Sequence, residues 1–126
     1  MSKIKVEYEY ILKTSIRIIE NEVTTPNGLE QWFADNVTVK DNIYTFTWGK
    51  SDDSAKLIAK RQGVYVRFRW TENEDEDYYF EFNYKMDSLT NALIFTVIDF
   101  CDEDELKENK SLWDNQINNL KRHIGA

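Results

Sequence analysis

The sequence contains very little cysteine, proline or glycine: one, one and four residues among 126. With Cys101 as its only cysteine the chain cannot form an internal disulfide, which indicates a reducing setting, so we expect a cytoplasmic protein. Four glycines leave little room for a phosphate-binding glycine loop, and neither a zinc-ligand spacing nor a nucleophile-elbow motif occurs in the sequence. We therefore expect no cofactor and no metal site.

Long hydrophobic runs and excess positive charge are also missing. No apolar stretch approaches the roughly 20 residues that a membrane-spanning helix needs. The net charge of −7 disfavours binding to nucleic-acid phosphates and to anionic lipids. Residues 1–7 are charged throughout and lack the apolar core of a signal peptide. We therefore expect no nucleic-acid partner and no membrane span.

The composition that remains, 41% hydrophobic and 14% aromatic, is typical of one globular domain over residues 1–126. Strict alternation of apolar and charged residues over 4–12 predicts a strand with one buried face. Further strands are predicted at residues 36–40, 43–48, 54–61, 64–70, 80–86 and 92–100. Asp41 and Asn42 tolerate positive φ and predict a tight hairpin. Strand 92–100 is apolar on both faces, which leaves its inward face open.

The longest helix is predicted at residues 102–124. Its apolar stripe consists of Leu106, Trp113, Ile117, Leu120 and Ile124, spaced three, four and seven residues apart. Asp102 followed by Glu105 predicts a capping box, and Gly125 can end the helix. An isolated helix with this stripe is not stable in water, so the predicted sheet must cover it.

Two short helices are predicted between the first two strands. The first carries Ile16, Ile19 and Val23 on one face and can be capped by Thr14 or Ser15. The second begins at Pro26 after the capping residue Thr25, and its apolar face consists of Leu29, Trp32 and Phe33. The resulting order, one strand, two short helices, six strands and a long helix, predicts an α+β fold whose curved antiparallel sheet wraps around the last helix.

Three segments support a family resemblance: residues 25–33, which end in Trp-Phe; the aromatic strand 44–49, which ends in Gly; and the helix 112–120. With them the chain resembles the helix-grip, or START-like, superfamily. Within that superfamily it is most similar to the group of the heat-shock protein 90 ATPase activator C-terminal domain. The acidic loop 72–77 and the acidic helix start resemble a small bacterial branch. Members of the superfamily include lipid carriers, hormone receptors, cyclases and co-chaperones, so the resemblance implies a fold more than a function.

Residues with catalytic potential are few. Cys101 precedes four acidic residues, a setting that raises the pKa of a thiol, and no second cysteine or neighbouring histidine accompanies it. His123, the only histidine, lies in the last helical turn, where a cation favours the helix dipole. The acidic segments 72–77 and 102–105 lack the glycine-punctuated alternation of a calcium loop. We therefore expect a protein that is not an enzyme.

The aromatic residues are more informative, because many lie on faces predicted to point inward. They either fill the core or form the walls of a cavity between the sheet and the last helix. For the second alternative, the predicted ligand-binding residues are Trp32, Phe46, Trp48, Phe68, Trp70, Phe82, Tyr84 and Trp113.

These alternatives correspond to two functions. The first is a binding module that holds a small apolar or amphipathic ligand between the sheet and the C-terminal helix, and a cavity above about 300 Å³ would favour it. The second is a protein-interaction or chaperone-accessory domain, for which Tyr65, Arg67, Arg69 and Tyr79 could supply exposed contacts. The sequence leaves the ligand, a protein partner and the oligomeric state open.

Overall fold

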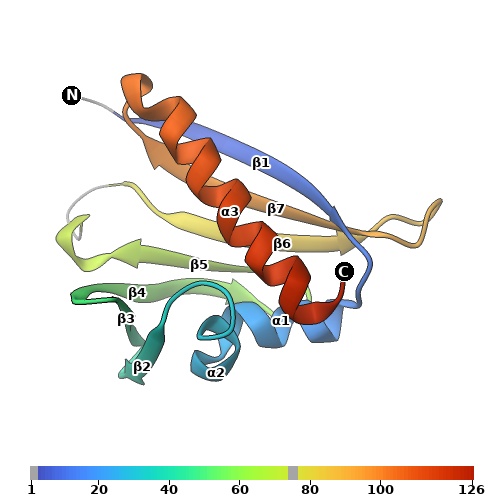
Figure 1. The fold of residues 1–126 in the computed structure, drawn as a ribbon, viewed down its shortest axis with the longest axis horizontal. Helices are drawn as coiled ribbons and strands as arrows, with labels where there is room; N and C mark the ends of the chain where they lie inside the picture. The colour runs from blue at the N-terminus through green and yellow to red at the C-terminus, as the bar shows by residue number, and fades with distance from the viewer. Residues whose placement is uncertain (1–2, 74–76) are drawn as a thin grey trace.

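The computed structural model describes residues 3–73 and 77–126 as a curved antiparallel sheet that is crossed by one long helix (Figure 1). The sheet has seven strands in the order β1-β7-β6-β5-β4-β3-β2, so the N-terminal strand pairs with the last strand in sequence. This is the predicted α+β helix-grip arrangement. The strands are β1 (Ile4–Leu12), β2 (Asn36–Lys40), β3 (Ile43–Trp48), β4 (Ser51–Arg61), β5 (Tyr65–Trp70), β6 (Phe80–Met86) and β7 (Leu93–Cys101).

The helices are α1 (Ile16–Thr24), α2 (Pro26–Leu29) and α3 (Leu106–Ile124), with single 3₁₀ turns at Thr71–Asn73 and Glu103–Glu105. In Figure 1, α3 crosses the concave face of the sheet, while α1 and α2 lie below it near its C-terminal end. Of the acidic loop predicted at 72–77, residues 74–76 lie outside the described residues. No helix among the described residues combines the length and the hydrophobicity that crossing a bilayer requires.

The local signals that define the first half of the fold are confirmed. Ser15 caps α1 by accepting a hydrogen bond from the backbone N–H of Ile18 at 3.2 Å. Asp41 and Asn42 both adopt positive φ, 52° and 66°, and form the two-residue turn between β2 and β3. Such turns match the right-handed twist of a hairpin, which is why this dipeptide predicted it.

Strand β4 begins three residues earlier than predicted. Trp48 pairs directly with Ser51, so the turn consists of Gly49 and Lys50 alone. Gly49 has a φ of +59°, which glycine adopts without steric cost. The polar residues 51–53 suggested a loop, but backbone pairing with β3 extends the strand through them, because the Gly49 turn already reverses the chain.

Helix α2 is shorter than predicted and ends at Leu29. The carbonyl of Leu29 accepts hydrogen bonds from the N–H groups of Phe33 and Ala34, at 2.9 and 3.2 Å, and these contacts turn the chain. Trp32 and Phe33 therefore lie in the turn after the helix, yet both are buried. The predicted apolar face exists, but a turn rather than a helix presents it.

The predicted capping box of the long helix is wrong. Residues 103–105 form a 3₁₀ turn, and neither Asp102 nor Glu105 makes a side-chain cap. Because α3 then starts at Leu106, this residue lies at the helix end and is 38% exposed, so it does not belong to the buried stripe. Gly125 ends the helix in the left-handed conformation, as predicted.

The structure also decides which face of β7 points inward. Leu93, Phe95 and Val97 are fully buried in the core beneath α3, and Asp99 lies on the same face. Ile94, Ile98 and Phe100 lie on the convex face. Val64 and Met86 continue the inward-facing series of β5 and β6, but they are exposed because the sheet ends there.

Candidate functional site

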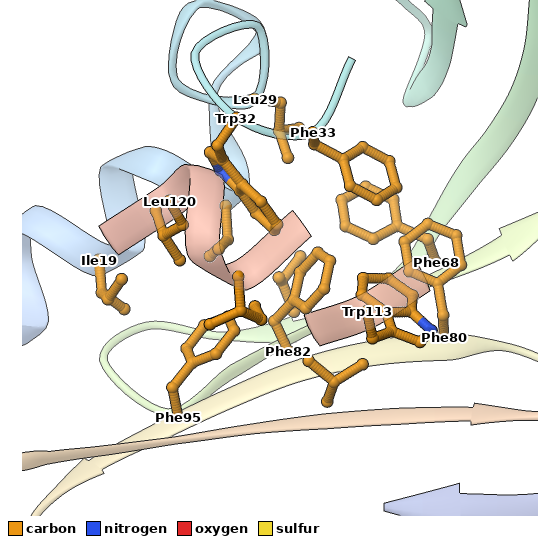
Figure 2. Packing of buried hydrophobic residues seen from close by; sticks show 14 of the residues in the cluster. Ile19, Leu29, Trp32, Phe33, Phe68, Phe80, Phe82, Phe95, Trp113 and Leu120 are labelled. Carbon is orange, nitrogen blue, oxygen red and sulfur yellow. The ribbon is translucent and has the colours of Figure 1, made fainter. Parts of the chain in front are cut away.

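The buried stripe of α3 consists of Trp113, Ile117 and Leu120, with exposures of 5%, 0% and 0%. These side chains divide the space beneath the helix into two ends. At the closed end, Ile117 and Leu120 lie over aliphatic residues of α1 and α2; Figure 2 shows Leu120 beside Ile19. At the open end, Trp113 packs on the Phe80 and Phe82 rings of β6 and lines a cavity together with Trp48 and Trp70.

The closed end is sealed. Helices α1 and α2 supply Ile19, Val23 and Leu29, all fully buried. A side-chain hydrogen bond from Trp32 Nε1 to the carbonyl of Glu22, 2.9 Å long, ties the turn after α2 to α1. Apolar side chains of the short helices therefore fill the space beneath α3 at this end.

The open end holds a cavity of about 370 Å³. Strand ends of the sheet form its floor, the turn after α2 contributes one wall, and the first half of α3 contributes the other. Its lining residues are Phe33, Trp48, Asp53, Trp70, Asp99, Leu112, Trp113 and Gln116. This volume lies within the range of small-molecule sites in proteins, about 300–1,000 Å³.

Four aromatic rings form the apolar part of the cavity, and Phe33 is at their centre. Its ring centroid lies 5.5 Å from that of Trp48 in an edge arrangement and 5.9 Å from that of Trp113 in a stacked one. Trp70 completes the group at 6.3 Å from Trp48. Trp48 and Trp70 are only half-buried, so ring surface remains available to a ligand.

Hydrogen bonds hold two of these rings in place. Trp48 Nε1 donates to the carbonyl of Phe33 at 2.7 Å, and Gln116 Nε2 donates to the same carbonyl at 3.1 Å. Trp113 Nε1 donates to Asp99 Oδ2 at 2.9 Å, and Asn109 Nδ2 donates to the same oxygen at 3.0 Å. The walls of the cavity are thus fixed before any ligand arrives.

Two carboxylates lie beside the rings. Asp99 is inward-facing and accepts the hydrogen bonds from α3, while its Oδ1 accepts from the N–H of Phe100 at 2.8 Å. Asp53 is exposed and pairs across the hairpin with Phe46, whose ring is in the core, so both side chains share the concave face. The cavity is apolar at its walls and acidic at two points of its rim.

A second, wider depression of about 630 Å³ lies on the other side of the turn after α2. Its lining is mostly polar, including Glu30, Asp35, Asn119, Arg122 and His123, with Trp32 as one of its few aromatic residues. The two openings share Phe33, Trp48 and Gln116. Trp48, at the end of β3, lines both openings and Trp32 lines the polar one, whereas no described residue of α1 or α2 lines either.

The eight predicted ligand-binding residues fall into two groups. Trp48, Trp70 and Trp113 line the 370 Å³ cavity, and Trp32 lines the polar depression. The remaining four are buried in the core and line neither opening: Phe46, Phe68, Phe82 and Tyr84. Phe68, for example, stacks on Phe80 with ring centroids 5.1 Å apart (Figure 2).

The sequence analysis missed Phe33, Gln116 and the two carboxylates as site residues. Phe33 had been assigned only to a helix face, and its central place depends on the early end of α2. Gln116 carried a weak signal, since it lies three residues after Trp113 on the same side of the helix. Asp99 is the only charged residue in strand β7, and that charge was the available signal for a functional position.

The two residues considered for catalysis lie apart from each other. Cys101 is buried near the start of α3, and burial, reinforced by Asp99, raises the pKa of its thiol. His123 lies at the other end of α3, where its Nε2 is 3.1 Å from Glu22 Oε1 on α1. A raised thiol pKa disfavours a nucleophilic thiolate at neutral pH.

Three carboxylates gather before α3: Asp102, Asp104 and Glu105, whose oxygens lie within 4.8 Å of one another. A hydrogen bond that the protonated Glu105 carboxyl donates to Asp102, together with the nearby negative charges, raises the pKa of Glu105. Proton sharing between neighbouring carboxylates accounts for this cluster without a cation.

Comparison with known proteins identifies relatives over the whole chain. A family model described as START-like superfamily domain matches residues 1–126. The solution NMR structure of a Bacteroides fragilis protein is 37% identical, covers 97% of this chain and 91% of its own, and superposes with a TM-score of 0.71.

More distant structures agree in fold. The Aha1 dimer of Colwellia psychrerythraea is 15% identical, with a TM-score of 0.79 over 94% of this chain and 93% of that one. A protein of Bacillus halodurans is also 15% identical, with a TM-score of 0.75 over 98% and 99%. At this identity the likeness concerns the fold alone. No curated protein matches the sequence significantly.

Proposed function

Because the chain belongs to the START-like superfamily, we propose that it is a non-catalytic binding module that holds a small apolar or amphipathic ligand in the 370 Å³ cavity. The observation that supports this most directly is the arrangement of Phe33, Trp48, Trp70 and Trp113. Their rings surround an opening instead of filling it, whereas the other end of the same cleft is sealed.

The energetics favour a ligand here. Half-buried tryptophan rings retain apolar surface in contact with water, and covering that surface contributes roughly 25 cal/mol per Å². The walls are held by hydrogen bonds from Trp48, Trp113 and Gln116, so little ordering is required on binding. The proposed site accordingly keeps Trp48, Trp70 and Trp113 from the predicted residues and adds Phe33, with the four core aromatics as supporting residues.

Thermal unfolding with a panel of small apolar and amphipathic compounds tests the proposal. A ligand present at 100 times its dissociation constant stabilises the native state by about 2.7 kcal/mol, which raises the melting temperature by several degrees. Intrinsic fluorescence adds an independent signal, since three of the four tryptophans line the cavity.

A matched pair of variants locates the binding site. Leu112 lines the cavity and is 58% exposed, whereas Leu89 lies in the β6–β7 turn and is 92% exposed. Both Leu→Gln changes should leave stability within about 0.5 kcal/mol of wild type. We expect Leu112→Gln to weaken binding and Leu89→Gln to leave it unchanged. Equal effects of the two changes, or no shift with any compound, would contradict the proposal.

The convex face is the second candidate, as an interaction surface for a protein partner. Tyr79 and Phe100 pack there with ring centroids 5.0 Å apart and are half-buried. Arg67 lies 4.1 Å from the ring centroid of Tyr79 and forms an ion pair with Glu81 at 2.7 Å. Of the predicted contact residues, Arg67 and Tyr79 therefore pack against each other. Arg67→Ala should therefore abolish partner binding if this face is the interface, and should leave ligand binding in the cavity intact.

A further inference from the structure

We propose that the ligand of the cavity carries a positive charge, and that an organic ammonium group lies among the tryptophan rings between Asp53 and Asp99. This inference names the ligand class and rests on the function proposed above. Three observations support it: the charge of the lining, the nature of the walls, and the hydrogen bonding of Asp99.

The charge of the lining favours a cation. Among the described residues around the cavity, Asp53 and Asp99 carry formal negative charge, and none is lysine, arginine or histidine. On α3, Lys110 forms an ion pair with Asp114 at 3.0 Å, while Arg122 and His123 line the other depression. A fatty acid or another anion would place like charges together in an apolar pocket, which costs more than it does in water.

The walls favour a cation for a second reason. The face of an indole ring is electron-rich, and a cation within about 6 Å of its centroid is attracted to it, most strongly when water is excluded. Trp48, Trp70 and Trp113 come from β3, β5 and α3, so their rings approach the cavity from different sides. Rings from several directions around one small space are typical of sites that recognise quaternary ammonium groups.

Asp99 contributes negative charge to the cavity and also orients one of its aromatic walls. Its Oδ2 accepts the indole N–H of Trp113, at 2.9 Å, and thereby orients this ring. Hydrogen bonding to an anion also makes the ring more electron-rich. A neutral ligand that covered Asp99 would remove water from a carboxylate without replacing it by a positive charge, and such burial is unfavourable. A cation compensates for that loss.

Isosteric probes test the inference on the whole protein. Benzyltrimethylammonium and neopentylbenzene have the same shape and differ only in nitrogen or carbon at one centre, and phenylacetate supplies the anion. We expect tryptophan fluorescence titrations at low salt to give at least about tenfold tighter binding for the cation than for its neutral isostere. Phenylacetate should bind most weakly of the three.

A pair of substitutions assigns the preference to the cavity. Asp53→Asn and Asp52→Asn change the net charge equally, but Asp52 faces the other side of the sheet, where it accepts a hydrogen bond from Thr47. We expect Asp53→Asn to weaken binding of the cation about threefold or more, and to leave the neutral isostere unaffected. Asp52→Asn should change neither.

The outcomes separate the two proposals. Equal or tighter binding of the neutral isostere would overturn the cationic ligand class and leave the binding function standing. A cation preference that Asp53→Asn does not reduce, or that Asp52→Asn reduces equally, would also overturn the inference, because the charge would then act from outside the cavity. Failure of all three probes and of the wider compound panel would overturn both proposals.

Discussion

The closed and open ends of the cleft beneath α3 share one sheet and one helix, yet only one of them is filled. At the closed end, aliphatic side chains of α1 and α2 interlock with Ile117 and Leu120. At the open end, flat rings meet at angles between 21° and 70°, and no helix covers them apart from α3 in the described part of the chain. Dense aliphatic packing therefore lies beneath one end of the helix, and the cavity lies beneath the other.

The largest expected effect comes from Trp113, which lies where the two ends meet. Its ring contacts those of Phe33, Phe80 and Phe82 at centroid distances of 5.9, 6.4 and 5.7 Å. Trp113→Ala should lower the free energy of unfolding by about 3–5 kcal/mol, measured by urea denaturation. Trp113→Phe keeps a ring but loses the bond to Asp99, so it should cost clearly less. If the alanine variant unfolds like wild type, α3 does not dock as described.

The second prediction compares the two ends directly along α3. Ile117 is fully buried at the closed end, and Leu112 is mostly exposed at the open end. We expect Ile117→Ala to cost about 2–5 kcal/mol, because it leaves a cavity in packed surroundings. Leu112→Ala should cost no more than about 0.5 kcal/mol. Similar losses for the two variants would show that the ends are packed alike.

The sequence predicted the arrangement of elements well and the site only in part. The alternation of β1 and the Asp41-Asn42 turn are local signals, and both are confirmed by the structure. The inward face of β7 is a tertiary property, since both of its faces are apolar and only docking of α3 selects one. For that reason Asp99 could not be placed in the cavity beforehand.

The place of Phe33 in the cavity also depends on tertiary structure that the sequence pattern does not reveal. Its periodicity predicted burial correctly, but the end of α2 at Leu29 depends on hydrogen bonds that converge on one carbonyl. That turn directs the Phe33 ring toward Trp48 and Trp113. The predicted aromatics Trp48 and Trp70 line the cavity because their strands end there, whereas Phe46 and Phe68 lie two residues further into the same strands and are covered by neighbouring rings.

The third prediction tests how tightly the closed end is built. A Cβ atom added to Gly28 would lie 2.2 Å from the carbonyl oxygen of Asn21 and 2.7 Å from Cα of Glu22. Because both are backbone atoms, α1 and α2 must move apart, and Gly28→Ala should cost about 1–3 kcal/mol. Its exposed neighbour provides the control: Asn27→Ala should change stability by less than about 0.5 kcal/mol. If Gly28→Ala left the free energy of unfolding unchanged, α1 and α2 would be able to move apart at little cost.

The smallest expected effect concerns Glu22, which is buried at the closed end and faces His123 of α3. Burial raises the pKa of its carboxyl above the ordinary value of 4.5, while the charge of His123 and a hydrogen bond from Asn21 oppose the increase. The folded protein therefore binds this proton more tightly than the unfolded chain does. The contribution of Glu22 to stability is fully present below about pH 4.5 and is lost as the pH rises through its folded pKa.

Glu22→Gln removes this titration and keeps the shape of the side chain. Near pH 4 the variant and wild type should unfold at similar denaturant concentrations, since Glu22 is protonated in both states of the wild type. Above that pH the variant should gain stability relative to wild type, because it carries no buried charge. His123→Gln should act in the opposite direction: without the histidine that opposes the increase, the pKa of Glu22 rises further, and the stability of the variant falls over a wider pH range. A stability difference between Glu22→Gln and wild type that stays constant from pH 4 to 8 would contradict this account, and the coupling of α1 to the end of α3 would then rest on packing alone.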